Sequence, residues 1–133
     1  MAKTIVMVLG VVFVLVGLLG FFMDSPLLGL FEVDMEHNVV HLLSGVIALV
    51  MASMGEGQAK LYAKIFGVVY ALVTVLGFVM GEGELVGFLA VNNEDNYLHL
   101  VLALVLLYAG FSKSSTAATP PSMPSGPTMN QSM

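Results

Sequence analysis

The sequence predicts an all-α, polytopic membrane protein with four transmembrane helices. Hydrophobic residues make up 58% of the 133 residues, charged residues only 10%, and the mean hydropathy is +0.96. An average soluble domain has about 25% charged residues, so a soluble globular fold is excluded. The charged positions separate four uncharged stretches of 17 to 20 residues, and helices of about 17 to 25 residues cross a bilayer core. Strands of a membrane barrel would alternate in polarity, and these stretches do not.

The first expected span runs from Ile5 to Met23, and Asp24-Ser25-Pro26 ends it. This apolar run is longer than the ~7 to 15 residues of a secretory signal, and no small-residue cleavage site follows it. We therefore expect the segment to be retained as a transmembrane helix.

The other three spans are bounded by polar and glycine-rich segments. The second begins after Glu36 and ends at Gly55-Glu56-Gly57-Gln58, where a tight turn is expected. The third ends at Gly81-Glu82-Gly83-Glu84, and the fourth begins after Asp95. Residues 113–133 are rich in Ser, Thr, Pro and Met. Because such a segment cannot bury a core, we expect a disordered cytoplasmic tail.

The charges of the chain predict its orientation. With four spans, all the lysines fall on one side of the membrane and eight of the nine carboxylates fall on the other. The positive-inside rule makes the lysine side cytoplasmic, so the N and C termini are both expected to be cytoplasmic. The lysines are Lys3, Lys60, Lys64 and Lys113. The anionic outer surface either attracts cations or simply keeps the loops solvated.

The chain carries an internal duplication. Glu36-His37-Asn38-Val39-Val40-His41-Leu42 and Glu94-Asp95-Asn96-Tyr97-Leu98-His99-Leu100 lie 58 residues apart. We predict that residues 1–112 form one four-helix transmembrane domain of two parallel two-helix repeats. The repeats cover residues of about 1–55 and about 58–112, and an axis along the membrane normal relates them.

Small residues are expected to let the helices approach closely. Gly10 and Gly17 lie two turns apart, Gly67 and Ala71 form a small-xxx-small pair, and Gly45 lies on the second span. Packing alone is the expected role of these residues.

Asn38 and Asn96 occupy corresponding positions at the start of the second and fourth spans. Asparagine side chains at such positions satisfy backbone N–H groups that have no partner within the helix. We interpret both as structural residues that cap their helices.

The histidines form a candidate metal site. His37 and His41 are four residues apart, as are Asp95 and His99, so each pair shares a helix face. If the second and fourth spans meet, these four side chains converge near the outer interface. Three imidazoles and a carboxylate suit zinc or another divalent cation. The alternative interpretation is that His41 and His99 form interhelical hydrogen bonds that hold the repeats in register.

Several other kinds of site are excluded or disfavoured. The chain has no Arg, no Cys, no phosphate-binding loop and no basic patch, so no acyl-transfer, phosphoryl-transfer, nucleotide or nucleic-acid site is expected. The residues between His37 and His41 lack the glutamate of a zinc protease. A haem held by His41 and His99 is disfavoured because its propionates would face eight carboxylates.

The segments that carry the duplication also carry a resemblance. Asn38-Val39-Val40-His41-Leu42-Leu43-Ser44-Gly45, residues 61–70 and Asn96-Tyr97-Leu98-His99-Leu100 resemble a bacterial family of small four-helix membrane proteins catalogued as a domain of unknown function. The similarity covers roughly residues 1–112, and the duplicated N-x-x-H-L is its most specific part. The resemblance implies the four-helix fold, bacterial origin and a place in the cytoplasmic (inner) membrane. It implies no reaction and no role for any residue.

The leading functional hypothesis is a non-enzymatic bacterial inner-membrane protein. Its outward-facing His/Asn/Asp cluster would stabilise the bundle, with a divalent metal such as zinc as the candidate ligand. The alternatives are a small transporter or channel subunit for protons or divalent metal, and an accessory subunit of a larger membrane complex. Polar residues become sparse inward of Ser44, which disfavours a channel within one monomer. The expected neighbours are the lipid bilayer, a second copy or another membrane protein.

The orientation can be tested with a topology reporter fused after Lys113. We expect the fusion to be active only in the cytoplasm, because the four lysines hold both ends of the helical domain inside. Activity only outside the cytoplasm would refute this topology.

Overall fold

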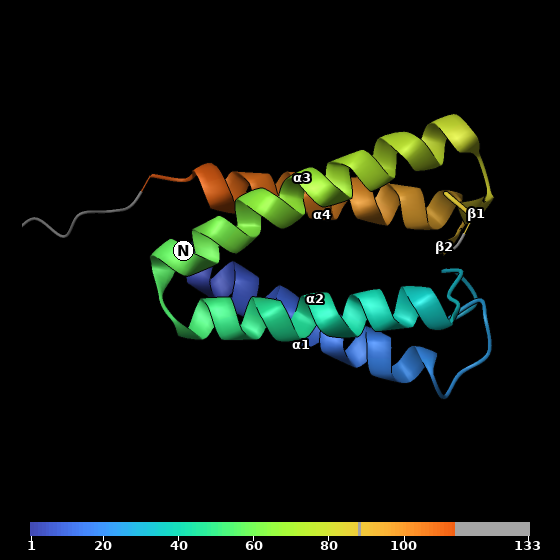
Figure 1. The fold of residues 1–133 in the computed structure, drawn as a ribbon, viewed down its shortest axis with the longest axis horizontal. Helices are drawn as coiled ribbons and strands as arrows, with labels where there is room; N and C mark the ends of the chain where they lie inside the picture. Colours follow the sequence, from blue (N-terminus) through green and yellow to red (C-terminus); the bar gives the residue numbers. More distant parts are fainter. Residues whose placement is uncertain (88, 114–133) are drawn as a thin grey trace, which may run out of the picture.

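The computed structural model describes residues 1–87 and 89–113, so residues 114–133 of the expected tail lie outside the described residues. The described part forms a four-helix bundle with one short β hairpin (Figure 1). The helices are α1 (Ala2–Gly20), α2 (Met35–Ser53), α3 (Glu56–Met80) and α4 (Asn93–Phe111). The antiparallel strands are β1 (Gly83–Leu85) and β2 (Leu89–Val91).

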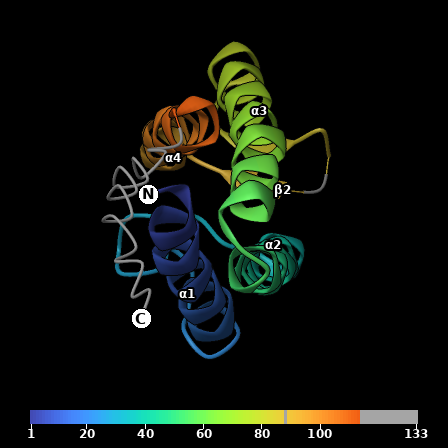
Figure 2. The same ribbon diagram turned by 90° about the vertical axis from the view of Figure 1, so that its left-hand side faces the viewer.

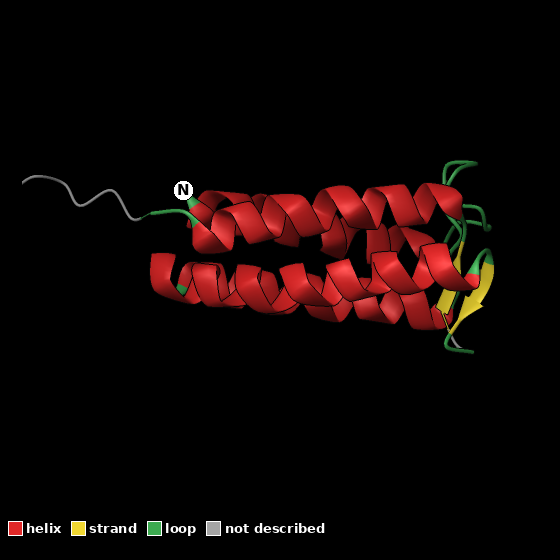
Figure 3. Ribbon diagram, turned by 90° about the horizontal axis from the view of Figure 1, so that it is seen from above, coloured by secondary structure: helices red, strands yellow, loops and turns green. Residues whose placement is uncertain are grey.

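The helices pack as two antiparallel pairs, α1 with α2 and α3 with α4 (Figure 1). Viewed along the bundle, the four helices occupy the corners of a quadrilateral, with α2 and α4 at opposite corners (Figure 2). The start of α1, the turn between α2 and α3, and the end of α4 lie together at one end, which we call the terminal end (Figure 1). The α1–α2 loop and the β hairpin lie at the other end, which we call the loop end (Figure 3).

Hydrogen bonds hold the terminal end together. The amino group of Met1 lies 3.1 Å from the Glu56 carboxylate, which also accepts the backbone N–H of Ala2 at 2.8 Å. The Lys60 ammonium donates to the carbonyl of Ser112 at 2.6 Å. The first and last helices are therefore both fastened to the first turns of α3.

Three of the four helices are long and apolar enough to cross a membrane. Their mean hydropathies are 2.6 for α1, 1.4 for α2 and 2.1 for α3. Four spans were expected, and α4 is the helix that is not among the three. It begins with Asn93-Glu94-Asp95-Asn96, and this polar first turn lowers its mean hydropathy. Large apolar side chains face outward from all four helices, for example Leu15, Val50, Leu72 and Leu104, which are each more than half exposed. Such a surface is what a bilayer solvates, so the chain is a membrane protein.

Two helix boundaries differ from those expected. α1 ends at Gly20 instead of Met23, because the N–H of Phe21 already turns back to the carbonyls of the last helical residues. The turn between α2 and α3 is shorter than expected and consists of Met54 and Gly55. Gly55 has a φ of 123°, which a residue with a side chain rarely adopts, so the chain reverses within two residues.

The β hairpin between α3 and α4 was not predicted, since its glycines indicated only the end of a helix. Glu84 lies opposite Ala90 in the hairpin. The chain reverses through Val86 and Gly87, whose φ angles are 54° and 82°. The strands are only three residues long, which is too short for a pattern of alternating side chains to indicate them.

The α1–α2 loop repeats this geometry in reduced form. Leu27 and Phe31 form an isolated antiparallel bridge, and positive φ angles of 55° and 72° occur between them at Leu28 and Gly29. These positions are 58 residues before the corresponding ones of the β hairpin. Both loops therefore fold back over the end of the bundle in the same way.

Glycines bring the paired helices into close contact, as expected from the sequence. A Cβ atom on Gly17 would lie 2.8 Å from both the carbonyl oxygen of Asn38 and the backbone nitrogen of Leu42. A Cβ atom on Gly45 would lie 2.7 Å from the backbone nitrogen of Val14. A Cβ atom on Gly67 would lie 2.9 Å from the side chain of Leu107 in α4. The expected packing role of these glycines is confirmed.

Two glycine substitutions test this packing. Gly17→Ala should destabilise the protein by about 1–3 kcal/mol, because the methyl group meets backbone that must move. Gly57→Ala is the matched control, since nothing lies within 4 Å of its Cβ position and alanine favours helix by up to about 1 kcal/mol. Thermal unfolding in detergent measures both changes. Equal melting temperatures for the two variants would contradict the packing argument.

Candidate functional site

All three histidines of the chain meet inside the bundle near its loop end. His37, His41 and His99 are 4%, 6% and 3% exposed, and one nitrogen of each ring lies within 4.8 Å of the others. The rings of His37 and His41 stack with their centroids 4.7 Å apart. The His99 centroid is 5.8 Å from that of His37 and 6.5 Å from that of His41. We call these three residues the histidine cluster.

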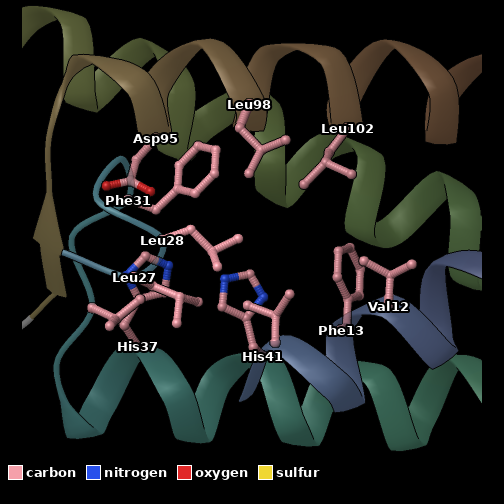
Figure 4. A pocket seen from close by; sticks show the side chains of 12 residues that line it. Val12, Phe13, Leu27, Leu28, Phe31, His37, His41, Asp95, Leu98 and Leu102 are labelled. Carbon is pink, nitrogen blue, oxygen red and sulfur yellow. The ribbon is translucent and has the colours of Figure 1, made fainter. Parts of the chain in front are cut away.

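The cluster joins two helices from opposite corners of the bundle. His37 and His41 lie one turn apart on α2 and point toward α4 (Figure 4). His99 reaches them from α4. The i, i+4 spacing puts both α2 rings on one face, so the stacked pair meets the third ring across the bundle.

A backbone carbonyl orients the ring of His37. Its Nδ1 lies 3.0 Å from the carbonyl oxygen of Ala90 in β2. A carbonyl oxygen only accepts hydrogen bonds, so Nδ1 carries the proton and donates it. The lone pair of the neutral ring is then on Nε2. This is the arrangement in which histidine ligates metals, with one nitrogen held by a carbonyl and the other free.

The other two rings make no hydrogen bond within the described residues. Nδ1 of His41 and Nδ1 of His99 are buried and have no partner there. Most buried polar atoms in proteins have a partner, and an exception calls for a physical reason such as an ion. The cluster therefore offers ring nitrogens that the described protein groups leave unsatisfied.

Asp34 fixes the segment that holds His37. As the N-cap of α2, its Oδ1 accepts the backbone N–H of His37 at 2.6 Å. Its Oδ2 accepts the backbone N–H of Ala90 at 2.6 Å. Both backbone groups of Ala90 are thus bound by α2, through Asp34 and His37, and the β hairpin is docked on that helix.

Asp95 lies outside the histidine cluster, although the sequence suggested it as the fourth ligand. Its Oδ2 accepts the backbone N–H groups of Glu32 and Asn92, both at 3.0 Å. Its own N–H donates to the Asn92 side chain, which completes a capping box at the start of α4. The carboxylate thus holds the α1–α2 loop against α4.

The expectation that Asn38 and Asn96 cap their helices is wrong. Asp34 and Asn92 are the N-caps, because each precedes its helix and accepts a backbone N–H from the first turn. The two helices therefore begin before the asparagines, which lie a full turn inside. Asn38 is 3% exposed and Asn96 is fully buried.

The two asparagines instead pack against glycines of the neighbouring helix. A methyl group added to Gly20 of α1 would overlap the side chain of Asn38. A methyl group added to Gly77 of α3 would likewise overlap the side chain of Asn96. Gly20 and Gly77 are corresponding positions, 57 residues apart, so each helix pair has one glycine that accommodates one asparagine.

Aromatic and hydroxyl side chains around the cluster were not predicted as part of the site. The ring of Phe13 lies 5.6 Å from that of His41, and the ring of Tyr70 lies 5.4 Å from that of His99. The hydroxyl of Ser44 donates to the carbonyl of His41 at 3.1 Å. The sequence did hold one signal, because Phe13 and Tyr70 end the corresponding segments Gly-Val-Val-Phe and Gly-Val-Val-Tyr.

Two cavities flank the histidine cluster. The larger has a volume of about 120 Å³ and lies between α1, the α1–α2 loop, α2 and α4 (Figure 4). It is lined by Val12, Phe13, Val16, Leu27, Leu28, Phe31, Val33, His37, His41, Asp95, Leu98 and Leu102. The smaller has a volume of about 50 Å³ and is lined by His37, Val40, His41, Ser44, Phe66, Val69, Tyr70, Val73, Leu89 and His99.

Comparison with known proteins identifies the family. The chain belongs to the family described as a domain of unknown function (DUF4383), which matches residues 3–112. The resemblance to a domain of unknown function, noted from the sequence, is thereby confirmed. No curated protein and no solved structure matches the chain.

The docking of the β hairpin can be tested through Asp34. Asp34→Ala should destabilise the protein by about 1–2 kcal/mol, because it removes a helix cap and leaves the Ala90 N–H without its acceptor. Hydrogen exchange at the Ala90 amide should become faster. Glu36→Ala, an exposed carboxylate in the same first turn, is the control and should change neither quantity. Unchanged exchange at Ala90 in the Asp34 variant would show that this contact does not hold the hairpin.

Proposed function

We propose that this member of the family is a non-enzymatic bacterial inner-membrane protein that binds a divalent cation, such as zinc, in the histidine cluster. The observation that carries the proposal is the convergence of three buried ring nitrogens within 4.8 Å of one another. These are all the histidines that the chain has. Imidazole is a ligand that zinc and neighbouring transition metals share.

The spacing of the nitrogens is compatible with a metal ion after a small closure. Zinc binds histidine nitrogen at about 2.0–2.1 Å, so two ligands of a tetrahedral ion lie about 3.4 Å apart. The ring nitrogens now lie up to 4.8 Å apart, so the longest of these distances would shorten by about 1.4 Å on binding. Three histidines leave the fourth position for a water molecule or another ligand. We omit Asp95 from the ligand set because its carboxylate accepts backbone N–H groups.

The unpartnered nitrogens favour metal binding over the hydrogen-bonding alternative. If His41 and His99 only locked the helices in register, their rings would donate to a neighbouring helix. Within the described residues neither ring does so, and Nδ1 of both is buried without a partner. The carbonyl of Ala90 that orients His37 gives further support, because ligating histidines usually have such a partner.

The charge distribution favours a cation. At the loop end, Asp34 and Asp95 lie beside the cluster in the first turns of α2 and α4. The lysines of the described residues lie toward the terminal end, near the start of α1, in the first three turns of α3 and after α4. With the loop end on the non-cytoplasmic side, as the positive-inside rule predicts, a cation would reach the cluster from that side of the membrane.

The core on the terminal side of the cluster favours binding over transport. Tyr62 donates its hydroxyl to the carbonyl of Ser44, so this polar side chain is satisfied by the backbone. Beyond it the buried side chains are small or apolar, and they are packed together as one core. They include Ala2, Val6, Ala52, Ala59, Ala63, Leu106 and Ala109. We therefore propose a bound ion and not a path for ions through one monomer.

The proposal includes the internal duplication. Two repeats, residues of about 1–55 and 58–112, would place His41 and His99 at corresponding positions on either side of a pseudo-two-fold axis. Their rings face each other with centroids 6.5 Å apart. Position 37 is histidine where the second repeat has Asp95, so the third ligand would come from one repeat only.

Metal binding can be tested on protein purified without a histidine tag. We expect one zinc ion per chain by elemental analysis, and a higher melting temperature with zinc than with chelator. At free zinc of about 100 times Kd, the stabilisation is about 2.7 kcal/mol. His41→Ala and His99→Ala should each abolish the rise in melting temperature that zinc causes. Both variants should still fold, because the apolar helices remain.

The controls separate this site from weaker ones. Glu94→Gln removes an exposed carboxylate near the start of α4 and should keep the zinc effect. If the histidines had only a structural role, each alanine variant would lose about 0.6–2 kcal/mol equally with zinc and with chelator. Identical wild-type curves under the two conditions would refute the metal proposal.

A further inference from the structure

The larger cavity has a volume suited to a single apolar ring. Its volume is about 120 Å³, and its walls include the aromatic rings of Phe13 and Phe31 (Figure 4). An engineered protein cavity of about 150 Å³ with similar apolar walls binds benzene. A six-membered ring with one small substituent therefore fits, and a longer molecule would extend through the mouth.

The mouth of this cavity faces the lipid. Val12, Leu28 and Leu98 line the cavity and are 43%, 70% and 37% exposed. Val12 and Leu98 belong to the outward-facing apolar surfaces of α1 and α4, which would contact acyl chains. A ligand would thus arrive dissolved in the bilayer, which selects neutral and apolar molecules.

One end of the cavity is polar and consists of acceptors. His37 donates its Nδ1 proton to Ala90, so the nitrogen left for a ligand is an acceptor. Asp95, when ionised, has acceptor oxygens only. His41 has a buried Nδ1 without a partner. A ligand hydroxyl would supply the donor that this end lacks, whereas a carboxylate or phosphate would be repelled by Asp95.

The smaller cavity, on the other side of the histidine cluster, has hydroxyl groups of the chain in its walls. Eight of its ten lining residues correspond to lining residues of the larger cavity at offsets of 57 or 58 residues, and Phe66 and His41 do not. At two corresponding positions the smaller cavity has a hydroxyl group and the larger has none. Tyr70 of the smaller cavity corresponds to Phe13 of the larger, and Ser44 corresponds to Leu102. Tyr70 is itself a phenol, with its ring 5.4 Å from that of His99.

We propose that the larger cavity binds a neutral, membrane-soluble phenol. Its ring lies against Phe13 between α1 and α4, and its hydroxyl donates to the histidine cluster. Its ring would lie beside the histidine cluster as the ring of Tyr70 lies beside that of His99 in the smaller cavity. This binding goes beyond the proposed metal site and needs no metal, so the two can fail separately.

The test compares 4-fluorophenol with 4-fluorotoluene by fluorine NMR on chelator-treated full-length protein in detergent. We expect saturable binding of the phenol, at least tenfold tighter than that of the toluene, because only the phenol satisfies the acceptors. Val12→Phe should fill the mouth and weaken phenol binding at least tenfold. Val11→Phe, the same change at an exposed neighbour that does not line the cavity, should leave the binding unchanged.

A second pair of variants guards against misfolding. Leu102→Phe fills the cavity from α4, and Leu104→Phe, 60% exposed and outside the cavity, is its control. Melting temperatures identify the folded variants. Absence of saturable phenol binding, equal affinity for the two probes, or full binding by the folded cavity variants would each overturn the proposal. An acyl chain or detergent tail in the cavity would appear as the first of these results.

Discussion

The fold depends on satisfying backbone polar groups where two loops cover the end of an apolar bundle. Each of the two loops is held by a carboxylate of the other helix pair. The hairpin that precedes α4 docks on α2, where Asp34 accepts the N–H of Ala90, and the loop that precedes α2 docks on α4, where Asp95 accepts the N–H of Glu32. Each carboxylate also accepts a backbone N–H at the start of its own helix. In surroundings of low polarity such groups are costly to leave unpaired, so the two helix pairs are joined where the loops cross.

The histidine cluster follows from this crossing. Because β2 is held on α2, its Ala90 carbonyl meets the ring of His37 and sets the proton on Nδ1. The crossing also brings α4 across the bundle, so that His99 faces His41. At the same level Asn38 fills the space left by Gly20, which keeps α1 close to α2. A change in the loops would therefore reach the ring nitrogens without touching a histidine.

The sequence predicted the helices well because charge spacing and apolar length report directly on what can enter a bilayer. The sequence also predicted that the three histidines converge. The i, i+4 spacing puts His37 and His41 on one face of their helix, and the repeated motif puts His99 at the position that corresponds to His41. The sequence did not place Asp95 or the asparagines. Capping depends on where a helix begins, and Asp34 and Asn92 begin α2 and α4 earlier than the apolar pattern indicates. The cavities could not be predicted, because each is lined by side chains of three helices and of the α1–α2 loop or β2, which only the tertiary structure brings together.

The differences between the two halves are as informative as their likeness. Packing alone would tolerate the same side chain at each pair of corresponding positions, yet the chain has His37 against Asp95 and Phe13 against Tyr70. Because of the first difference, α2 contributes two histidines to the cluster and α4 only one. Because of the second, the larger cavity lacks the hydroxyl that Tyr70 brings to the smaller one. All four of these residues line one or both of the cavities beside the cluster. The differences in side chain thus lie at the histidine cluster, whereas the glycine–asparagine packing is the same in both helix pairs.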